Sequence, residues 1–321
     1  MRIHWIGLLC LVGCEAEPEI VPHRPIEGID ELSQPLSDLT AQCVFTASAH
    51  SIALTLNGGD IAVVARAPDG ALTVNGFACG AATAIAVRRI DVTEGTSGDQ
   101  SLILDYGGGV FGAGLAGAPG VVIDLGNETV GDSLKLAGTT GTDRFVFGAA
   151  GITINSDSYL DIVVTHVEDF VISLDNGDDS FSGAGNAVTG AAFAQAVTVY
   201  GGSGADALRG GDGDDTLDGG DGNDSFTTGA SSDGNDALRG GLGTDTADYS
   251  TRIAAVTITM DGAADDGALG ETDNVAADVE ILKGGMGDDH LTGSINSDTI
   301  SRSVFLQPSS LCFSTNLNGR S

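Results

Sequence analysis

The chain has 321 residues and a formal net charge of −32, which comes from 45 acidic and 13 basic residues. This balance excludes nucleic acid as a partner, because binding to phosphates requires a basic surface. The 49 glycines and an aromatic content of 5% indicate many small turns rather than a thick aromatic core.

Residues 1–13 predict an export signal. Arg2 gives a positive start, and the apolar run Ile3–Val12 is too short to span a bilayer. The run ends in Leu11-Val12-Gly13-Cys14, which resembles the lipobox of bacterial lipoproteins. The resemblance implies acylation of Cys14, a lipid bilayer as partner, and a place at the outer membrane or cell surface. An ordinary secretory signal, and therefore a secreted protein, is the alternative.

Residues 14–40 hold four of the seven prolines and predict a flexible tether. Cys43 and Cys79 follow within one small region. In an exported protein such a pair predicts a disulfide bond, which leaves Cys312 unpaired.

Residues 41–200 predict a β-rich domain, because short strand signals alternate with Gly, Asn or Asp turns. Long amphipathic helix signals are missing. The spacing favours stacked, β-helix-like coils, with a separate β-sandwich as the alternative. The strand signals are Ile52–Leu56, Ile61–Val64, Leu102–Leu104, Phe145–Phe147, Ile162–Val164, Phe170–Ile172 and Val197–Val199.

A nine-residue unit then repeats from Gly201 to Asp248: two glycines, any residue, glycine, any residue, aspartate, any residue, an apolar residue, any residue. Glycine tolerates the positive φ of a tight turn. Carboxylates and turn carbonyls are hard oxygen ligands that suit calcium. The apolar eighth residue (Leu208, Leu217, Phe226) points inward, so units must stack to make a core.

The array contains one faulted unit and returns after an interruption. The insertion Thr228–Ala230 precedes a unit in which Ser231-Ser232 replace the two glycines. The pattern returns at Gly284 and wears out by Ser301.

The unit resembles the RTX, or hemolysin-type, calcium-binding nonapeptide. The resemblance implies an all-β fold, a right-handed parallel β-roll or β-helix solenoid over residues 201–301. It also implies several bound Ca²⁺ ions. The implied carboxylate ligands are Asp206, Asp215, Asp224, Asp236, Asp245, Asp289 and Asp298. The implied carbonyl ligands belong to Gly202, Gly204, Gly211, Gly213, Gly220, Gly222, Gly241, Gly243, Gly285 and Gly287.

Several segments beside the main array are ambiguous. Residues 249–283 interrupt it with an acidic loop, Asp261–Asp273, which we predict to be exposed; a further calcium site is the alternative. Echoes of the unit around Asp143 and Asp179 predict ordinary strand turns, again with calcium as the alternative. Residues 302–321 predict either a cap on the solenoid or an aberrant tail.

The sequence carries no zinc-protease, lipase-elbow, P-loop or EF-hand motif, and we predict no catalytic residue. We expect a calcium-binding, non-enzymatic surface lipoprotein with a structural, adhesive or interaction role. Its repeats are expected to fold on extracellular calcium. The alternative is a secreted enzyme with its catalytic site in residues 41–200. A protein or glycan partner remains unnamed by the sequence.

Overall fold

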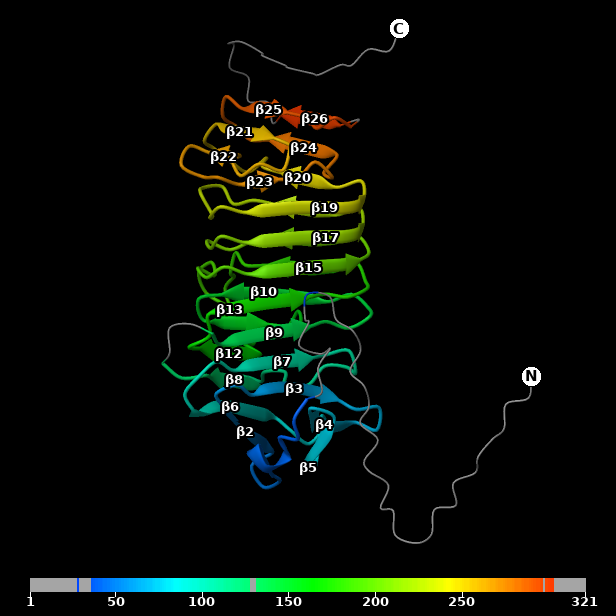
Figure 1. Ribbon diagram of the computed structural model, residues 1–321, viewed down its shortest axis with the longest axis vertical. Helices are drawn as coiled ribbons and strands as arrows, with labels where there is room; N and C mark the ends of the chain where they lie inside the picture. Colours follow the sequence, from blue (N-terminus) through cyan, green and yellow to red (C-terminus); the bar gives the residue numbers. More distant parts are fainter. Residues whose placement is uncertain (1–27, 29–35, 128–130, 297, 303–321) are drawn as a thin grey trace, which may run out of the picture.

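The computed structural model describes residues 28, 36–127, 131–296 and 298–302. Within these ranges the chain forms an elongated stack of short strands, with one 3-10 helix, η2 (Thr40–Gln42), at its N-terminal end (Figure 1). In the same ranges, no helix is long and apolar enough to cross a membrane. The predicted export signal with Cys14, the residues after 302 and Cys312 lie outside the described residues.

One sheet of thirteen strands runs the length of the stack. In order across the sheet its strands are β1 (Cys43–Thr46), β2 (Ser51–Asn57), β6 (Arg89–Thr96), β8 (Val121–Asp124), β12 (Ile162–Thr165), β11 (Gly151–Thr153), β10 (Arg144–Gly148), β14 (Ser180–Ser182), β16 (Ala207–Arg209), β18 (Ser225–Thr227), β20 (Thr246–Asp248), β24 (Ile281–Gly284) and β26 (Thr299–Arg302).

A second sheet of ten strands and a small third sheet make up the opposite side. The second sheet holds β23 (Asn274–Val275), β19 (Ala237–Gly243), β17 (Thr216–Gly222), β15 (Thr198–Ser203), β13 (Asp169–Ser173), β9 (Ser133–Ala137), β7 (Ser101–Asp105), β3 (Ile61–Arg66), β4 (Ala71–Val74) and β5 (Phe77–Thr83). The third holds β22 (Gly267–Ala268), β21 (Val256–Thr259) and β25 (His290–Thr292).

In the repeat region, one full turn of the stack takes two nine-residue units. Thr198 in β15 pairs in parallel with Thr216 in β17, eighteen residues later. Thr216 pairs in turn with Ala237 in β19, twenty-one residues later, so the turn at Thr228–Ala230 absorbs the three inserted residues without a slip in register. Consecutive units therefore lie on opposite edges of the stack.

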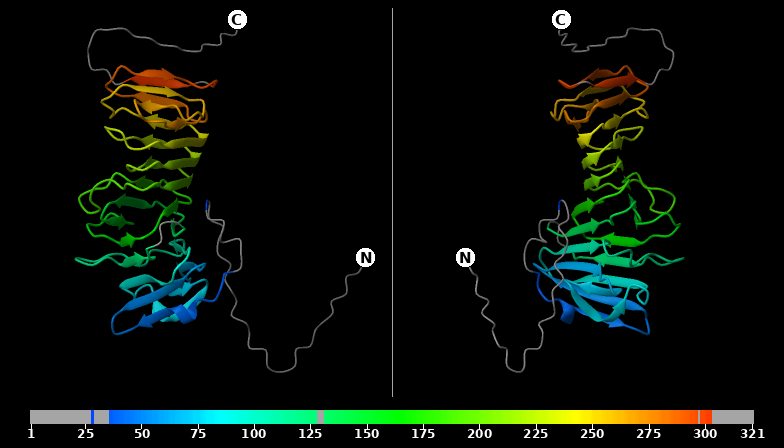
Figure 2. Two further views of the ribbon diagram at one scale, coloured as in Figure 1. Left: turned by 60° about the vertical axis from the view of Figure 1, so that its left-hand side comes forward. Right: turned by 90° about the vertical axis from the view of Figure 1, so that its right-hand side faces the viewer.

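We name these edges by their turns. Edge one holds the turns that lead from the second sheet to the thirteen-stranded sheet, at residues 204–206, 223–224 and 244–245. Edge two holds the turns that lead back from the thirteen-stranded sheet, to the second sheet at residues 210–215 and 228–236 and to the third sheet at residues 249–255. The turns of both edges are short between β15 and β20, whereas longer loops leave the stack farther upstream (Figure 2).

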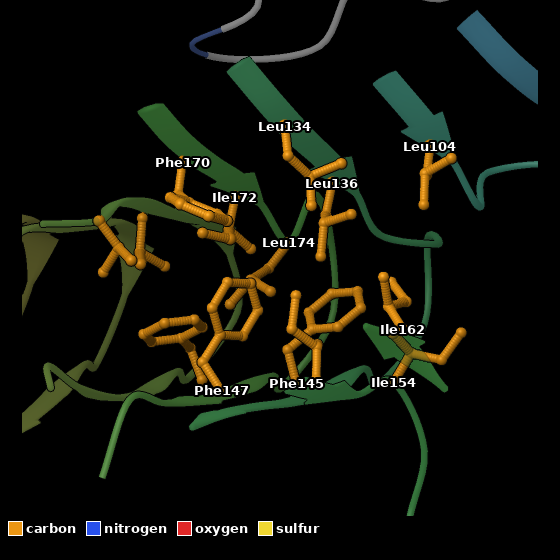
Figure 3. Packing of buried hydrophobic residues seen from close by; sticks show 14 of the residues in the cluster. Leu104, Leu134, Leu136, Phe145, Phe147, Ile154, Ile162, Phe170, Ile172 and Leu174 are labelled. Carbon is orange, nitrogen blue, oxygen red and sulfur yellow. The ribbon is translucent and has the colours of Figure 1, made fainter. Parts of the chain in front are cut away.

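The core lies between the sheets and changes character along the stack. In the repeats it is built from the eighth residue of each unit, and Leu208, Leu217 and Phe226 are all buried as predicted. Upstream it holds aromatic rings: Phe147 lies edge-on to Phe170, with ring centroids 6.3 Å apart (Figure 3). The repeat region therefore buries little apolar surface per turn and needs another source of stability.

The N-terminal end of the stack is closed covalently. Cys43 on β1 and Cys79 on β5 form a disulfide bond with a Cα–Cα distance of 5.7 Å. These two strands are the end strands of the two large sheets, so the bond joins the sheets at that end of the stack. Leu39 is buried in the core beside them, so the last residues of the predicted tether are part of the fold.

The predicted all-β, parallel solenoid is confirmed. The alternative of a β-sandwich in residues 41–200 is wrong, because strands such as β7, β9 and β13 stack in parallel. The pairing of β13 with β15 carries the second sheet across residue 200 without interruption.

Candidate metal centre

A ladder of aspartates follows edge one. The backbone N–H of Asp206 donates to Oδ1 of Asp224 at 2.8 Å, and the N–H of Asp224 donates to Oδ1 of Asp245 at 2.8 Å. One turn upstream, the N–H of Asp179 donates to Oδ1 of Asp206 at 2.8 Å. Each carboxylate thus binds its own turn to the turn before it.

The second carboxylate oxygen of these residues has no donor. Among the described residues, Oδ2 of Asp179, Asp206, Asp224 and Asp245 is buried and accepts no hydrogen bond. Burying a carboxylate oxygen without a partner is costly, so the arrangement requires a cation or a proton. Edge one therefore presents a row of buried carboxylate oxygens without a hydrogen-bond donor.

Glycine is required on both sides of this row. A Cβ at Gly201 would lie 2.5 Å from Oδ2 of Asp206, and a Cβ at Gly240 would lie 2.6 Å from Oδ2 of Asp245. A Cβ at Gly222, whose φ is +154°, would collide with the carbonyl oxygen of Gly204 in the turn before. The fourth-position carbonyls thus point along the stack at the next turn.

Burial and mutual repulsion raise the pKa values of the ladder. Burial, followed by the neighbouring carboxylates, raises the pKa of Asp224 and of Asp245 to about 6. The same causes raise the pKa of Asp179 to about 7. Negative charge at these positions is disfavoured in the folded chain. A bound cation would therefore lower the free energy of the folded chain with ionised carboxylates.

Edge two carries a second ladder with a different hydrogen-bonding pattern. The N–H of Asp215 donates to Oδ1 of Asp236 at 3.0 Å, and the N–H of Asp236 donates to Oδ1 of Asp273 at 2.9 Å. Oδ2 of Asp215 accepts from the N–H of Gly211 at 2.7 Å. Oδ2 of Asp273 accepts from the Tyr249 hydroxyl at 3.0 Å. This ladder is supplied with more internal donors than edge one.

Within edge two, Asp236 lies among several other carboxylates, which repel its negative charge. Burial, followed by the carboxylates of Asp215, Asp273 and Asp233, raises its pKa to about 9. A positive charge is therefore needed here as well.

Most of the loop Asp261–Asp273 is exposed as predicted, but three of its acidic residues, Asp266, Glu271 and Asp273, are buried. Asp266 accepts from the N–H of Thr259 at 2.6 Å and from that of Val275 at 2.8 Å, and it holds the loop against the stack. Asp273 joins the edge-two ladder, whereas Asp265 is exposed. The signal for Asp273 was a carboxylate two residues before a buried apolar residue, Val275.

Two further ladder positions were not assigned from the sequence. The turn at Asp179 was expected to be ordinary, yet its Oδ1 accepts from the N–H of Asp143 at 2.7 Å and it continues the ladder upstream. Glu280 ends the ladder, because its Oε2 accepts from the N–H of Asp245 at 2.8 Å. Both residues precede a buried apolar residue by two positions, Phe181 and Leu282.

The last two predicted carboxylates lie in the final turns. Oδ1 of Asp289 accepts from the N–H of Val256 at 3.1 Å, and Oδ1 of Asp298 accepts from the Ser294 hydroxyl at 3.0 Å. Both residues are half-buried. Asp298 is thus held within its own turn, and Asp289 is tied to the preceding one.

The predicted carbonyl ligands separate by edge. The glycines of edge one, Gly202, Gly204, Gly220, Gly222, Gly241 and Gly243, stack directly on one another. On edge two, Gly211 packs on the carbonyl of Phe193, and Gly285 packs on that of Arg252. Gly213 and Gly287 are packed against backbone in the same way.

The donor set fits a hard cation. In the described ranges, no group of three or more His, Cys, Asp or Glu side chains forms a ready-made metal cage. Each turn instead offers one carboxylate together with turn carbonyls. An all-oxygen set is what calcium takes, and thiol or imidazole ligands would favour other metals.

Comparison with known proteins identifies this pattern. A family model of the RTX calcium-binding nonapeptide repeat, in four copies, matches residues 200–233, 231–247 and 277–301. No curated protein and no solved structure matches the chain. The chain therefore contains RTX repeats, a structural calcium-binding motif. Repeats of this kind bind several Ca²⁺ ions.

Proposed function

We propose that this chain is a non-enzymatic surface lipoprotein whose repeat region folds when it meets extracellular calcium. Its role is structural, adhesive or one of interaction with a protein or glycan partner. The observation that carries the proposal is the row of buried Oδ2 atoms on edge one, at Asp179, Asp206, Asp224 and Asp245. These atoms give the fold a need for positive charge that its own residues do not meet.

The carboxylates that hold calcium in this proposal are those of the two ladders. On edge one they belong to Asp179, Asp206, Asp224 and Asp245, with the carbonyls of the stacked glycines beside them. On edge two they belong to Asp215 and Asp236. Asp289 and Asp298 serve the final turns.

Calcium acts by neutralising charge that the thin core cannot otherwise accommodate. Extracellular calcium modules have dissociation constants of roughly 10⁻⁴ M, so about 1 mM calcium would add about 1.4 kcal/mol for each such site. At a cytosolic level of roughly 10⁻⁷ M the same contribution nearly vanishes. The repeats would therefore be stable outside the cell and weak inside it.

Two features support export to an oxidising surface. The sequence Leu11-Val12-Gly13-Cys14 resembles a lipobox, which would place acyl chains on Cys14. The Cys43–Cys79 disulfide belongs to an oxidising compartment. Together they favour a lipid-anchored protein whose solenoid extends from the membrane surface.

Paired substitutions in one turn test calcium coordination. Asp224 lies in the ladder, whereas Asp221 in the same turn is exposed and occupies the third position of the unit. In a calcium titration of the full chain followed by circular dichroism, Asp224→Ala should raise the folding midpoint several-fold. Asp221→Ala, which removes the same formal charge, should leave it nearly unchanged, and the difference should persist at high salt. Equal midpoints for the two variants would contradict the proposal.

A further inference from the structure

A buried guanidinium lies on edge two, one turn beyond Asp236. Arg252 is 1% exposed and belongs to the turn 249–255, between β20 and β21. This turn rests on the faulted turn 228–236, and the Thr251 hydroxyl donates to the Thr228 carbonyl at 2.9 Å. The arginine therefore lies at the interface between two successive edge-two turns. At the other interfaces along this edge, the turns present carboxylates.

Two buried carboxylates hold the guanidinium. Nη1 of Arg252 donates to Oε1 of Glu271 at 2.8 Å, and Nη2 donates to Oδ1 of Asp233. Arg252 also lies over the Tyr249 ring, 5.9 Å from its centroid, and the hydroxyl of that ring binds Asp273. The positive charge thus lies beside Asp273, the last carboxylate described for the edge-two ladder.

Departures from the nine-residue pattern explain why the interface at Arg252 differs from those between regular turns. Its lower turn has Ser231-Ser232 in place of two glycines and carries three inserted residues, which bring Asp233 inside to 8% exposure. Asp212, which precedes the ladder residue Asp215 by the same three positions, is exposed. The upper turn, Tyr249–Ala255, contains no aspartate or glutamate. This turn contributes an arginine, and the ladder carboxylate that follows Asp236, Asp273, comes from the next loop.

We infer that Arg252 permanently supplies, between these two turns, the positive charge that calcium supplies elsewhere in the stack. The level formed by Asp233, Arg252 and Glu271 is a latent divalent-cation site that the chain fills with its own guanidinium. This inference rests on the proposed calcium-dependent folding. It implies that the contact between the turns 228–236 and 249–255 persists at calcium concentrations too low for the flanking turns.

Replacing the arginine by an uncharged side chain tests the inference. Arg252→Met leaves two buried carboxylates without a counter-charge, which is destabilising unless another cation enters. The full-length variant should need at least three-fold more calcium to fold, as measured by circular dichroism. At saturating calcium it should regain the wild-type signal and bind one more Ca²⁺ per chain, as measured by isothermal titration calorimetry.

Three further variants make the result specific. Arg252→Lys keeps the charge and should keep the wild-type calcium stoichiometry. Arg239→Met removes an exposed arginine, whose nearest carboxylate oxygen on Asp218 is 4.0 Å away, and should change neither quantity. Lys283→Met, on the half-buried pair with Asp248, extends the control to an ion pair at 3.0 Å.

Three outcomes overturn the inference. They are an unchanged midpoint for Arg252→Met, a wild-type stoichiometry at saturation, and a loss of folding that calcium does not reverse. If the folding of the wild-type protein did not depend on calcium, the proposed function itself would be refuted. The two failures are thereby distinguished.

Discussion

At the residue scale, the recurring device is a carboxylate two positions before a buried apolar side chain. Its Oδ1 accepts the N–H of the equivalent residue in the preceding turn, as Asp224 does for Asp206. The same device operates in turns that depart from the nine-residue unit, at Asp179 and, with a longer side chain, at Glu280. The ladder is therefore a property of stacking, and the glycines decide only how closely the turns approach.

Asp179 tests whether the calcium ladder extends upstream of the family match. Asp179→Asn keeps an oxygen that accepts the N–H of Asp143 but removes the charge. We expect a calcium midpoint raised about two- to five-fold, which corresponds to about 0.4–1 kcal/mol. Asp178→Asn is the matched control, because Asp178 is exposed and its amide oxygen can still accept the N–H of Ala205. If both variants titrate like the wild type, calcium does not reach this turn.

At the scale of elements, the N-terminal end of the stack, the part that follows it and the repeat turns are stabilised by different means. The disulfide joins β1 and β5, the end strands of the two large sheets, and an aromatic core follows upstream of β15. The thin turns between β15 and β20 depend on their carboxylate ladders. In a stack whose turns contact only their neighbours, each such contribution acts locally.

The disulfide should therefore stabilise the N-terminal end without changing the response to calcium. Replacing Cys43 and Cys79 by serine should lower the stability of this end by about 3 kcal/mol, because a loop of 36 residues is released. Thermal melting in saturating calcium should show an earlier first transition. The calcium midpoint for folding of the repeat region should not change. If the first thermal transition and this calcium midpoint shifted together, the stack would fold as one cooperative unit.

At the scale of the whole molecule, the net charge of −32 and the buried ladders oppose folding unless cations or protons are present. The ladder carboxylates carry raised pKa values, whereas the ion-paired Asp248 and Glu271 have pKa values lowered from their ordinary range. More carboxylates of the described residues have a raised pKa than a lowered one. The calcium-free protein should accordingly behave differently from an ordinary acidic protein as pH changes.

The raised pKa values predict that the calcium-free protein becomes less stable as pH rises. A carboxylate whose folded pKa exceeds its unfolded value of about 3.9 stabilises the fold fully below that value and loses the contribution as pH rises through the folded pKa. With Asp224 and Asp245 at about 6 and Asp236 at about 9, calcium-free stability should fall between about pH 4 and pH 9. Thermal melts in calcium-depleted buffers measure this, and added calcium should abolish the decline at pH 8. Stability that rises with pH without calcium would contradict it.

Anchoring is the other property of the whole molecule. If Cys14 is acylated, mass spectrometry of the N-terminal peptide from the native host should show the lipid on that residue, after cleavage behind Gly13. The membrane fraction should contain the protein, and Cys14→Ser should release it to the soluble fraction. An unmodified N-terminus cleaved at another position would exclude the anchor.

The sequence alone determined the repeat, the positions of its carboxylates and the inward side chains. The reason is that the nine-residue pattern is local: the turn, the carboxylate and Leu208 or Leu217 all fall within one unit. The tertiary structure decided which residues meet across turns. Asp245 meets Glu280 and Asp236 meets Asp273 at separations of 35 and 37 residues, and Arg252 reaches Asp233 and Glu271 from a turn with no repeat signal. Such partners depend on how inserted and interrupted turns stack in register, and no pattern confined to nine residues contains that information.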